Sequence, residues 1–159
     1  MSQQDQDRAK EQAEAQLSCI RDMLAAASLD WERLEELREL IQGEGCEEAC
    51  EEYREELAEL EEAAGDYESQ EEAEQAIYDN PLSIEYRSGW ASSREEMQPE
   101  EFQILLCTGG PAVRIMGELD FQGEPYRAWF EYQDWGTPWT MLFEGQGDAL
   151  SYAQRLIVM

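Results

Sequence analysis

Apolar residues recur every three or four positions through the first half of the chain, which places them on one face of a helix and predicts amphipathic helices. These positions are Leu17, Ile20 and Leu24, then Leu34, Leu37 and Ile41, then Cys50, Tyr53, Leu57 and Leu60. Ser28 is suited to cap the second helix, and the Gly-Glu-Gly of residues 43–45 is expected to end it. No Gly or Pro forces a break between Leu24 and Ser28, so the first two helices could also be one.

A shorter helix is predicted over residues 69–78. Ser69 has the side chain of an N-cap residue, and a residue that precedes proline avoids the helical region of backbone space. We therefore expect this helix to stop before Asn80-Pro81.

Beyond Pro81 the apolar and polar residues alternate, which is the pattern of half-buried strands. Four strands are predicted, over residues 82–87, 102–107, 112–119 and 126–133. Turn signals separate them, the clearest being Gly-Gly-Pro at 109–111 and Gln-Gly-Glu-Pro at 122–125, and short connections favour an antiparallel meander. The closing segment carries Leu150, Ala153 and Leu156 at helical spacing and predicts a helix that covers one face of the sheet.

The predicted fold class is therefore α+β. An acidic N-terminal helical hairpin or bundle occupies residues 1–80, and a small antiparallel sheet with a C-terminal helix occupies residues 81–159.

Charge separates the same two regions. The chain of 159 residues has 38 acidic and 11 basic side chains, for a net charge of -27. Residues 1–80 contain 26 acidic and 6 basic side chains, whereas residues 81–159 contain 12 and 5. Such a charge repels nucleic acids and anionic membranes and attracts basic surfaces. We expect no direct nucleic-acid binding, no membrane association and a basic protein as partner.

The chain has no apolar run of membrane-spanning length, and its first residues are too polar for a signal peptide. The expected location is the cytoplasm of the host cell.

The most acidic stretch is residues 46–64, in which nine of nineteen residues are Glu and only Arg54 is basic. On a helix, Cys46, Cys50, Tyr53, Leu57, Leu60 and Ala64 form an apolar seam. The opposite face carries the acidic strip, which consists of Glu48, Glu51, Glu55, Glu59 and Glu62. The nine carboxylates give about one charge per 3.2 Å of helix, close to the spacing of about 3.4 Å along one DNA strand. The predicted partner-binding set adds Glu52 from this helix and Glu32, Glu35, Glu36 and Glu39 from the preceding one.

Three interpretations of this acidic set remain open: a nucleic-acid mimic, a surface for some other basic partner, and a solvated helix face. Glutamate is a good helix former, which supports the last of them. However, Lys10 is the only lysine in the chain, so interspersed lysines do not relieve the negative bias.

Three phrases of the second half, "LSIEYRSGW", "EEFQILLCTGGPAVRIMGELD" and "RAWFEYQDWGTPWT", resemble a family of small, mostly uncharacterised proteins of phages, plasmids and other mobile elements. The resemblance covers residues 81–159 and brings no activity with it. It implies a mobile-element setting, in which an acidic protein is expected to interfere with host nucleic-acid-binding machinery.

Catalytic signals are weak. The absence of histidine removes the commonest general base. Cys107, before Thr-Gly-Gly, is interpreted as a strand-end core thiol, and Glu131 with Asp134 as ordinary carboxylates rather than a cation site. An all-cysteine metal site would need all four thiols, Cys19, Cys46, Cys50 and Cys107. We expect no enzyme activity, no cofactor, no metal and no required disulfide.

Four tryptophans, Trp90, Trp129, Trp135 and Trp139, are interpreted as a lock that closes the open end of the sheet, in preference to a binding platform. Arg87, Arg114 and Arg127 are expected to pair across strands with Glu85, Glu118 or Glu131. The module is expected to be a scaffold that could also form a homodimer.

The sequence thus predicts an acidic binding protein, a nucleic-acid mimic that acts as an anti-defence inhibitor by occupying the basic nucleic-acid-binding surface of a host protein. The alternative is an enzyme or ligand-binding domain in residues 81–159, with the acidic helices as a solubilising arm.

Overall fold

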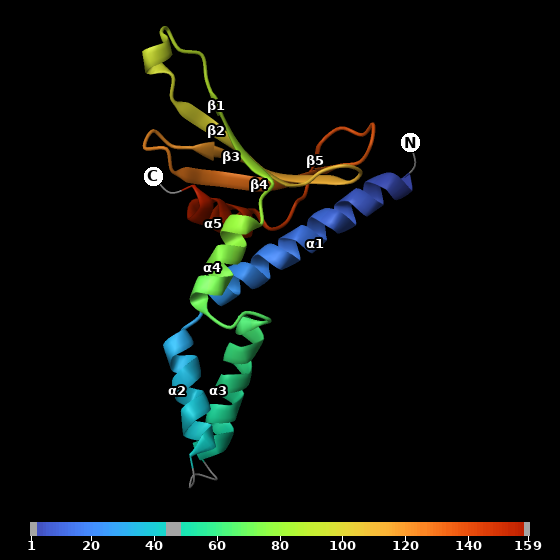
Figure 1. Ribbon diagram of the computed structural model, residues 1–159. Coiled ribbons are helices and arrows are strands. Elements are labelled where there is room, and N and C mark those ends of the chain that lie inside the picture. The colour runs from blue at the N-terminus through green and yellow to red at the C-terminus, as the bar shows by residue number, and fades with distance from the viewer. Residues whose placement is uncertain (1–2, 44–48, 158–159) are drawn as a thin grey trace. The chain divides into compact units, whose positions relative to one another are not determined.

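The computed structural model describes residues 3–43 and 49–157, with the side chains of Ala49 and Cys50 left out. The fold is α+β, as predicted: helices come first, a five-stranded antiparallel sheet follows, and a helix closes the described chain (Figure 1). The elements are α1 (Gln3–Ala27), α2 (Trp31–Gln42), α3 (Ala49–Ala64), α4 (Gln70–Asp79), β1 (Ser83–Ser88), the 3₁₀ helix η1 (Arg94–Glu96), β2 (Pro99–Cys107), β3 (Ala112–Leu119), β4 (Pro125–Gln133), β5 (Thr140–Met141) and α5 (Gln146–Leu156).

The chain divides into two compact units. The helical unit comprises Asp22–Ala76, and the sheet unit comprises the described residues on either side of it, 3–21 and 77–157. This division differs from the boundary near residue 80 that charge and pattern indicate, because the first part of α1 belongs with the sheet.

Side-chain caps define the helices of the helical unit. Asp30, not Ser28, caps α2: its Oδ1 accepts a hydrogen bond from the backbone N–H of Arg33 at 3.0 Å. Because α1 ends at Ala27, the first two helices are separate. Gly43 ends α2 as predicted, whereas residues 44 and 45 lie outside the described residues.

The predicted start and stop of α4 are confirmed. The Oγ of Ser69 accepts a hydrogen bond from the N–H of Glu72 at 3.1 Å, and the helix ends at Asp79, directly before Asn80-Pro81.

The sheet has the order β1-β2-β3-β4-β5, and every pair is antiparallel. Alternate residues of β2, β3 and β4 are buried on one face, with Phe102 opposite Gly117 and Gly117 opposite Ala128. A Cβ on Gly117 would come within 2.1 Å of the Phe102 ring and 2.5 Å of the Arg127 carbonyl oxygen. The phenyl ring of Phe102 therefore occupies the space that a side chain at position 117 would need. β5, with only two residues, is too short for a periodic signal and was not predicted.

Helix α5 and the first part of α1 lie on the same side of the sheet (Figure 1). The buried residues of α5 are Ala149, Tyr152 and Ala153. Of the predicted positions Ala153 is thus buried, whereas Leu150 and Leu156 are only half-buried. The fully buried Tyr152 accepts a hydrogen bond from Asn80 Nδ2 at 2.9 Å and donates one to the Ile77 carbonyl at 3.4 Å.

Residues 3–21 of α1 contribute a buried face of small and aliphatic side chains to the sheet unit, namely Ala9, Ala13, Leu17 and Ile20. Leu17 packs on Gly145, where an added Cβ would lie 2.6 Å from Leu17 Cδ1. Gly145 has a φ of +76°, a conformation that glycine adopts without strain, so the residue allows both the turn into α5 and the close approach of α1.

Among the residues that the structure describes, no helix combines the length and apolarity needed to cross a membrane.

Candidate partner-binding surface

The predicted acidic surface is built on α2 and α3, which pack side by side as a hairpin (Figure 1). Leu34, Leu37 and Ala64 are buried in the hairpin seam. Tyr53, Leu57 and Leu60 of the predicted apolar seam are half-buried, while Cys46 and the side chain of Cys50 lie outside the described part. The apolar periodicity therefore fixes which face of α3 turns toward α2.

Two arginines clamp this seam. Arg33 binds Glu56 of α3 in bidentate fashion, at 2.8 Å from Nε to Oε1 and 3.0 Å from Nη2 to Oε2. Arg38 Nε lies 3.5 Å from Glu61 Oε1. Residues five apart lie about 140° apart around a helix, so the two pairs lie on opposite flanks of the seam. These interhelical pairs were not predicted, and the only signal for them is the five-residue spacing shared by Arg33/Arg38 and Glu56/Glu61.

The Arg33–Glu56 pair changes the ionisation of both groups. Hydrogen bonding by the Arg33 guanidinium lowers the pKa of Glu56 below its ordinary value of 4.5. Hydrogen bonds to Glu56 and then Glu36 raise the pKa of Arg33 above its ordinary value. The pair is thus charged at neutral pH and partly exposed to solvent, which limits its net contribution to stability.

The same arginines engage two members of the predicted partner-binding set within α2. Arg33 Nη1 lies 3.3 Å from Glu36 Oε2, and Arg38 Nη1 lies 2.7 Å from Glu35 Oε1. Glu35 and Glu36 therefore have cations beside them already, which sequence analysis did not anticipate.

The acidic strip itself remains exposed where it is described. Glu51, Glu55, Glu59 and Glu62 are exposed on α3, and none makes an ion pair with a described residue. Glu48 lies outside the described residues.

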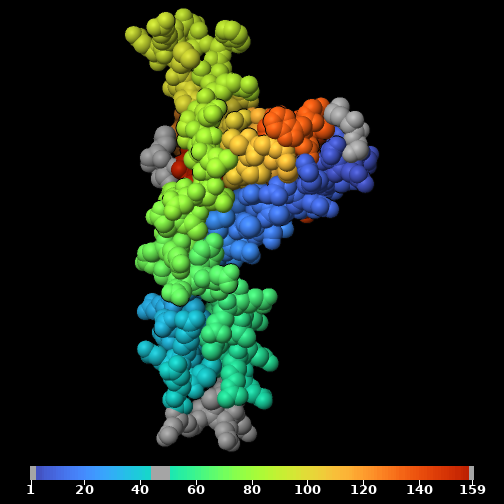
Figure 2. All heavy atoms as spheres, turned by 45° about the vertical axis from the view of Figure 1, so that its right-hand side comes forward, coloured from blue at the N-terminus to red at the C-terminus, as the bar shows by residue number. Residues whose placement is uncertain are grey.

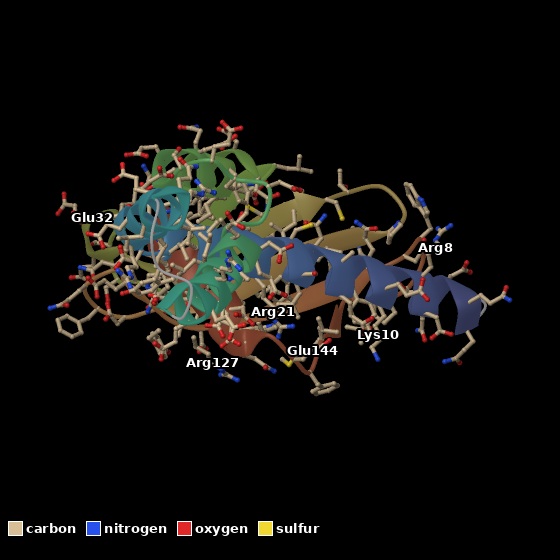
Figure 3. All side chains as sticks on the ribbon, turned by 90° about the horizontal axis from the view of Figure 1, so that it is seen from below. Arg8, Lys10, Arg21, Glu32, Arg127 and Glu144 are labelled. Atoms are coloured by element: carbon tan, nitrogen blue, oxygen red, sulfur yellow. The ribbon has the colours of Figure 1, made fainter. Side chains whose placement is uncertain are left out.

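The rest of the predicted set includes Glu52, Glu32 and Glu39, which are exposed and likewise without an ion pair within the described ranges. Figure 3 shows Glu32 on the outer side of α2. The structure thus brings most of the predicted set onto one helical hairpin.

The balance of charge in the helical unit is one-sided. Residues 22–76 contain 21 acidic and 3 basic side chains. Two of the three cations, Arg33 and Arg38, are held at the seam, and the third, Arg54, is exposed with no ion pair to a described residue. The outward faces of the hairpin therefore offer carboxylates with almost no compensating cation.

The open face of the sheet carries arginine–carboxylate pairs. Arg114 binds Glu131 at 2.7 Å and Arg127 lies 3.4 Å from Glu118, as the strand pattern predicted. Arg87 binds Glu101 at 2.6 Å rather than Glu85, because register places Glu101 directly opposite it.

The tryptophans do not form the predicted core lock. Trp90 is fully exposed and Trp135 is 77% exposed. The half-buried Trp129 and Trp139 lie on the open face, where Arg127 stacks over Trp129 at 5.1 Å and Arg114 over Trp139 at 4.0 Å. Phe102, Phe130 and Tyr152 fill the core instead. The indole rings of Trp129 and Trp139 thus pack against arginine side chains on the open face. The buried face of the sheet is filled by smaller aromatic rings.

Asp134 holds the "QDWGTPWT" loop in place. Its Oδ1 accepts the Trp135 N–H at 2.7 Å, and its Oδ2 accepts from Arg8 Nη2 at 3.0 Å. Arg8, labelled in Figure 3, also donates to the Gly110 carbonyl at 3.3 Å. Asp134 therefore joins α1 to the loops at one end of the sheet.

The side chains of the sheet unit that were weighed as a cation site or a nucleophile have structural roles or surroundings of their own. Glu131 and Asp134 are separately engaged by Arg114 and Arg8, and within the described part of the chain no cluster of three or more metal-binding side chains occurs. Burial raises the pKa of the half-buried Cys107 thiol, which disfavours a reactive thiolate there, whereas Cys19 is exposed.

The chain was compared with protein-family models, with curated proteins and with solved structures, and none of the three comparisons found a match. The resemblance of residues 81–159 to mobile-element proteins stays a prediction.

Proposed function

We propose that this protein is an acidic inhibitor that binds a basic host protein and occupies the surface on which that protein holds nucleic acid. In a phage or mobile-element setting, such a protein would act against host defence from within the cytoplasm. The contact surface is the α2–α3 hairpin, with the acidic strip of α3 at its centre.

One observation carries this proposal: four consecutive described members of the strip are exposed and without an ion pair among the described residues. Stability of the hairpin alone would favour mixed charges, because like charges three or four residues apart disfavour a helix by a few tenths of a kcal/mol per pair. The apolar seam and the two arginine clamps already hold the hairpin together. The strip is therefore available for a partner, and its charge spacing suits lysines and arginines that otherwise contact phosphates.

The test compares the parent chain with a variant in which Glu51, Glu55, Glu59 and Glu62 are changed to Gln. Glutamine retains helix propensity, and the four side chains point away from the seam, so folding should be preserved. A matched control changes four exposed carboxylates of the sheet unit, Glu95, Glu96, Glu124 and Glu144, to Gln and removes the same net charge.

Affinity capture from host extract, with and without competing duplex DNA, would identify the partner. We expect a nucleic-acid-binding protein that the parent and the control variant retain and that DNA displaces. Affinity of the strip variant should fall by about 2 kcal/mol or more, at about 0.5 kcal/mol or more for each contact. Equal affinity and equal salt dependence of the strip variant and the parent would leave the strip as a solvated helix face.

A further inference from the structure

The outer edge of β1 is open to pairing. Among the described residues β1 pairs only with β2, and its residues Glu85, Tyr86 and Arg87 are exposed. The yellow-green atoms of this part of the chain face the viewer in Figure 2. An uncovered edge strand presents unpaired backbone N–H and C=O groups and is a template for another strand.

The hydrogen bonding of β1 tells which residues present those groups. The N–H of Leu82 donates to the Leu105 carbonyl at 2.7 Å and thus points toward β2. The Leu105 carbonyl therefore points toward β1, and Leu105 is the register partner of Ser83. Because the direction alternates along a strand, the backbone groups of Ser83, Glu85 and Arg87 bond to β2, and those of Ile84 and Tyr86 point toward the outer edge.

We propose that this edge pairs in antiparallel fashion with the same edge of a second copy of the chain, about a two-fold axis at Tyr86. In this register Glu85 of one copy stands opposite Arg87 of the other, twice per dimer, and the two Tyr86 residues stand opposite each other. The two Tyr86 residues, whose backbone groups point outward, then form a hydrogen-bonded pair, and Glu85 faces Arg87 in the adjacent non-hydrogen-bonded pairs, where side chains lie closer together.

Charge selects both the occupant and the register. Glu85 makes no ion pair with a described residue. Arg87 contacts Glu101 through Nε and Nη2, and because a guanidinium has five N–H donors, it can bind a second carboxylate as well. Centring the axis on Glu85 would place two carboxylates opposite each other, and centring it on Arg87 would do the same with two guanidinium groups. Only the register centred on Tyr86 sets opposite charges across the interface at both positions.

Two surface hollows beside Tyr86 offer room for the second strand's side chains. One, of about 400 Å³, is mainly apolar, and its lining includes Tyr86, Leu119, Phe121 and Ile157 beside the polar Gln98, Asp120 and Gln122. The other, of about 290 Å³, includes Glu85, Arg87, Glu101, Gln103 and Met116. Side chains of a paired strand alternate between the faces of the sheet, so the second Tyr86 enters the apolar hollow and the second Glu85 and Arg87 enter the polar one.

Electrostatic repulsion between two copies is weaker at the β1 edge than the total net charge of the chain suggests, because most of the excess negative charge lies in the helical unit. The described residues of the sheet unit carry 17 acidic and 8 basic side chains, against 21 and 3 in the helical unit. At physiological ionic strength, exposed charges more than about 8 Å apart are largely screened.

Sedimentation velocity of the full chain tests the proposal with two charge variants. At micromolar to submillimolar concentrations the parent should sediment as a dimer of the 18.4 kDa chain. Glu85→Lys places two cationic pairs across the axis, and Arg87→Glu places two anionic pairs there, so each variant alone should dissociate at least tenfold more readily. An equimolar mixture of the two restores opposite charges at both positions and should recover the dimer.

Circular dichroism confirms that each variant is folded, and Glu144→Lys, an exposed charge reversal away from β1, should leave the dimer unchanged. A parent that stays monomeric across this concentration range overturns the proposal. So does a dimer that persists in both single variants, and so does a mixture that remains as dissociated as its components.

Discussion

Arg33 of α2 and Glu56 of α3 form a bidentate ion pair across the hairpin, with Nε–Oε1 and Nη2–Oε2 distances of 2.8 and 3.0 Å. With Arg38 and Glu61 on the other flank, the pair fixes the register of two helices whose remaining charges repel one another. Two of the three arginines of the helical unit are therefore used in contacts between α2 and α3, and most outward carboxylates have no cation beside them among the described residues.

The Arg33–Glu56 pair should make hairpin stability depend on pH. The pKa of Glu56 is lowered in the folded chain, so the pair stabilises the fold above the ordinary carboxyl value of 4.5 and loses that effect as pH falls through the lowered value. Thermal melting followed by circular dichroism should show a lower melting temperature for Glu56→Gln at pH 6 to 7. The difference from the parent should shrink steadily below about pH 4. Glu55→Gln, at an exposed position with no ion pair to a described residue, is the matched control. If its melting temperature differs from that of the parent with the same sign and pH dependence, the effect belongs to the general loss of a carboxylate.

Tyr152→Phe should destabilise the sheet unit by about 1–2 kcal/mol, because it removes a buried hydroxyl bound to Asn80 and Ile77. Burial raises the pKa of Tyr152 to about 12. A group whose pKa is raised on folding contributes stability below its unfolded value, near 10, and loses it as pH rises toward 12. Denaturant unfolding at pH 7 and above pH 10 should therefore show the difference between parent and variant narrowing in alkali. Tyr78→Phe, at an exposed tyrosine, should behave as the parent does.

Gly117→Ala should cost about 1–3 kcal/mol, because the added methyl group meets the Phe102 ring and the Arg127 carbonyl. Chemical denaturation of the variant measures this cost. Gly147→Ala provides the comparison, since no atom of a described residue lies within 4 Å of a Cβ there. Equal stability of the two variants would show that β3 can move away from Phe102 at little cost.

Asp134→Asn should destabilise the sheet unit by about 1–2 kcal/mol, since it removes a charge-assisted bond from Arg8 while keeping an acceptor for the Trp135 N–H. Arg8→Met should cost a similar amount, and the double variant should cost less than the two single changes together. A double-mutant cycle in denaturant measures this coupling. Additive effects would mean that α1 docks on the sheet independently of this contact.

The alternation of apolar and polar residues predicted the positions of four of the five described strands, but it did not predict which of their aromatic side chains are buried. β3 was predicted at its observed bounds because alternation and flanking turns both mark residues 112–119. The tryptophans were misplaced because size alone favours burial, whereas the arginines Arg114 and Arg127 on the open face provide them with a different packing partner. Whether a tryptophan is buried in the core or stacks on an arginine depends on which face of the sheet its side chain lies on. The local spacing of residues does not determine this.

The helices illustrate the same limit. Ser28 and Asp30 are both good capping residues two positions apart, and only backbone geometry decides between them. The contact of α1 with the sheet unit rests partly on Ala9 and Ala13, small residues that give a weak hydrophobic signal but permit close packing. On the acidic surface, helical periodicity predicted the exposed side of α3, while the pairing of Glu35 and Glu36 with arginines depends on side-chain conformation.

The order of the two units along the chain gives the acidic hairpin a modular character. Residues 22–76 interrupt a sheet unit that begins before them and resumes after them, so the helical unit that contains the hairpin is inserted within the sequence of the sheet unit. The core residues Leu17, Ile115 and Tyr152 all come from outside the insertion. A change in the length or charge of the hairpin therefore leaves these core residues of the sheet unit unchanged. Swapping it for a neutral helical hairpin of equal span would yield a chimaera with the sheet unit intact and a new surface to present.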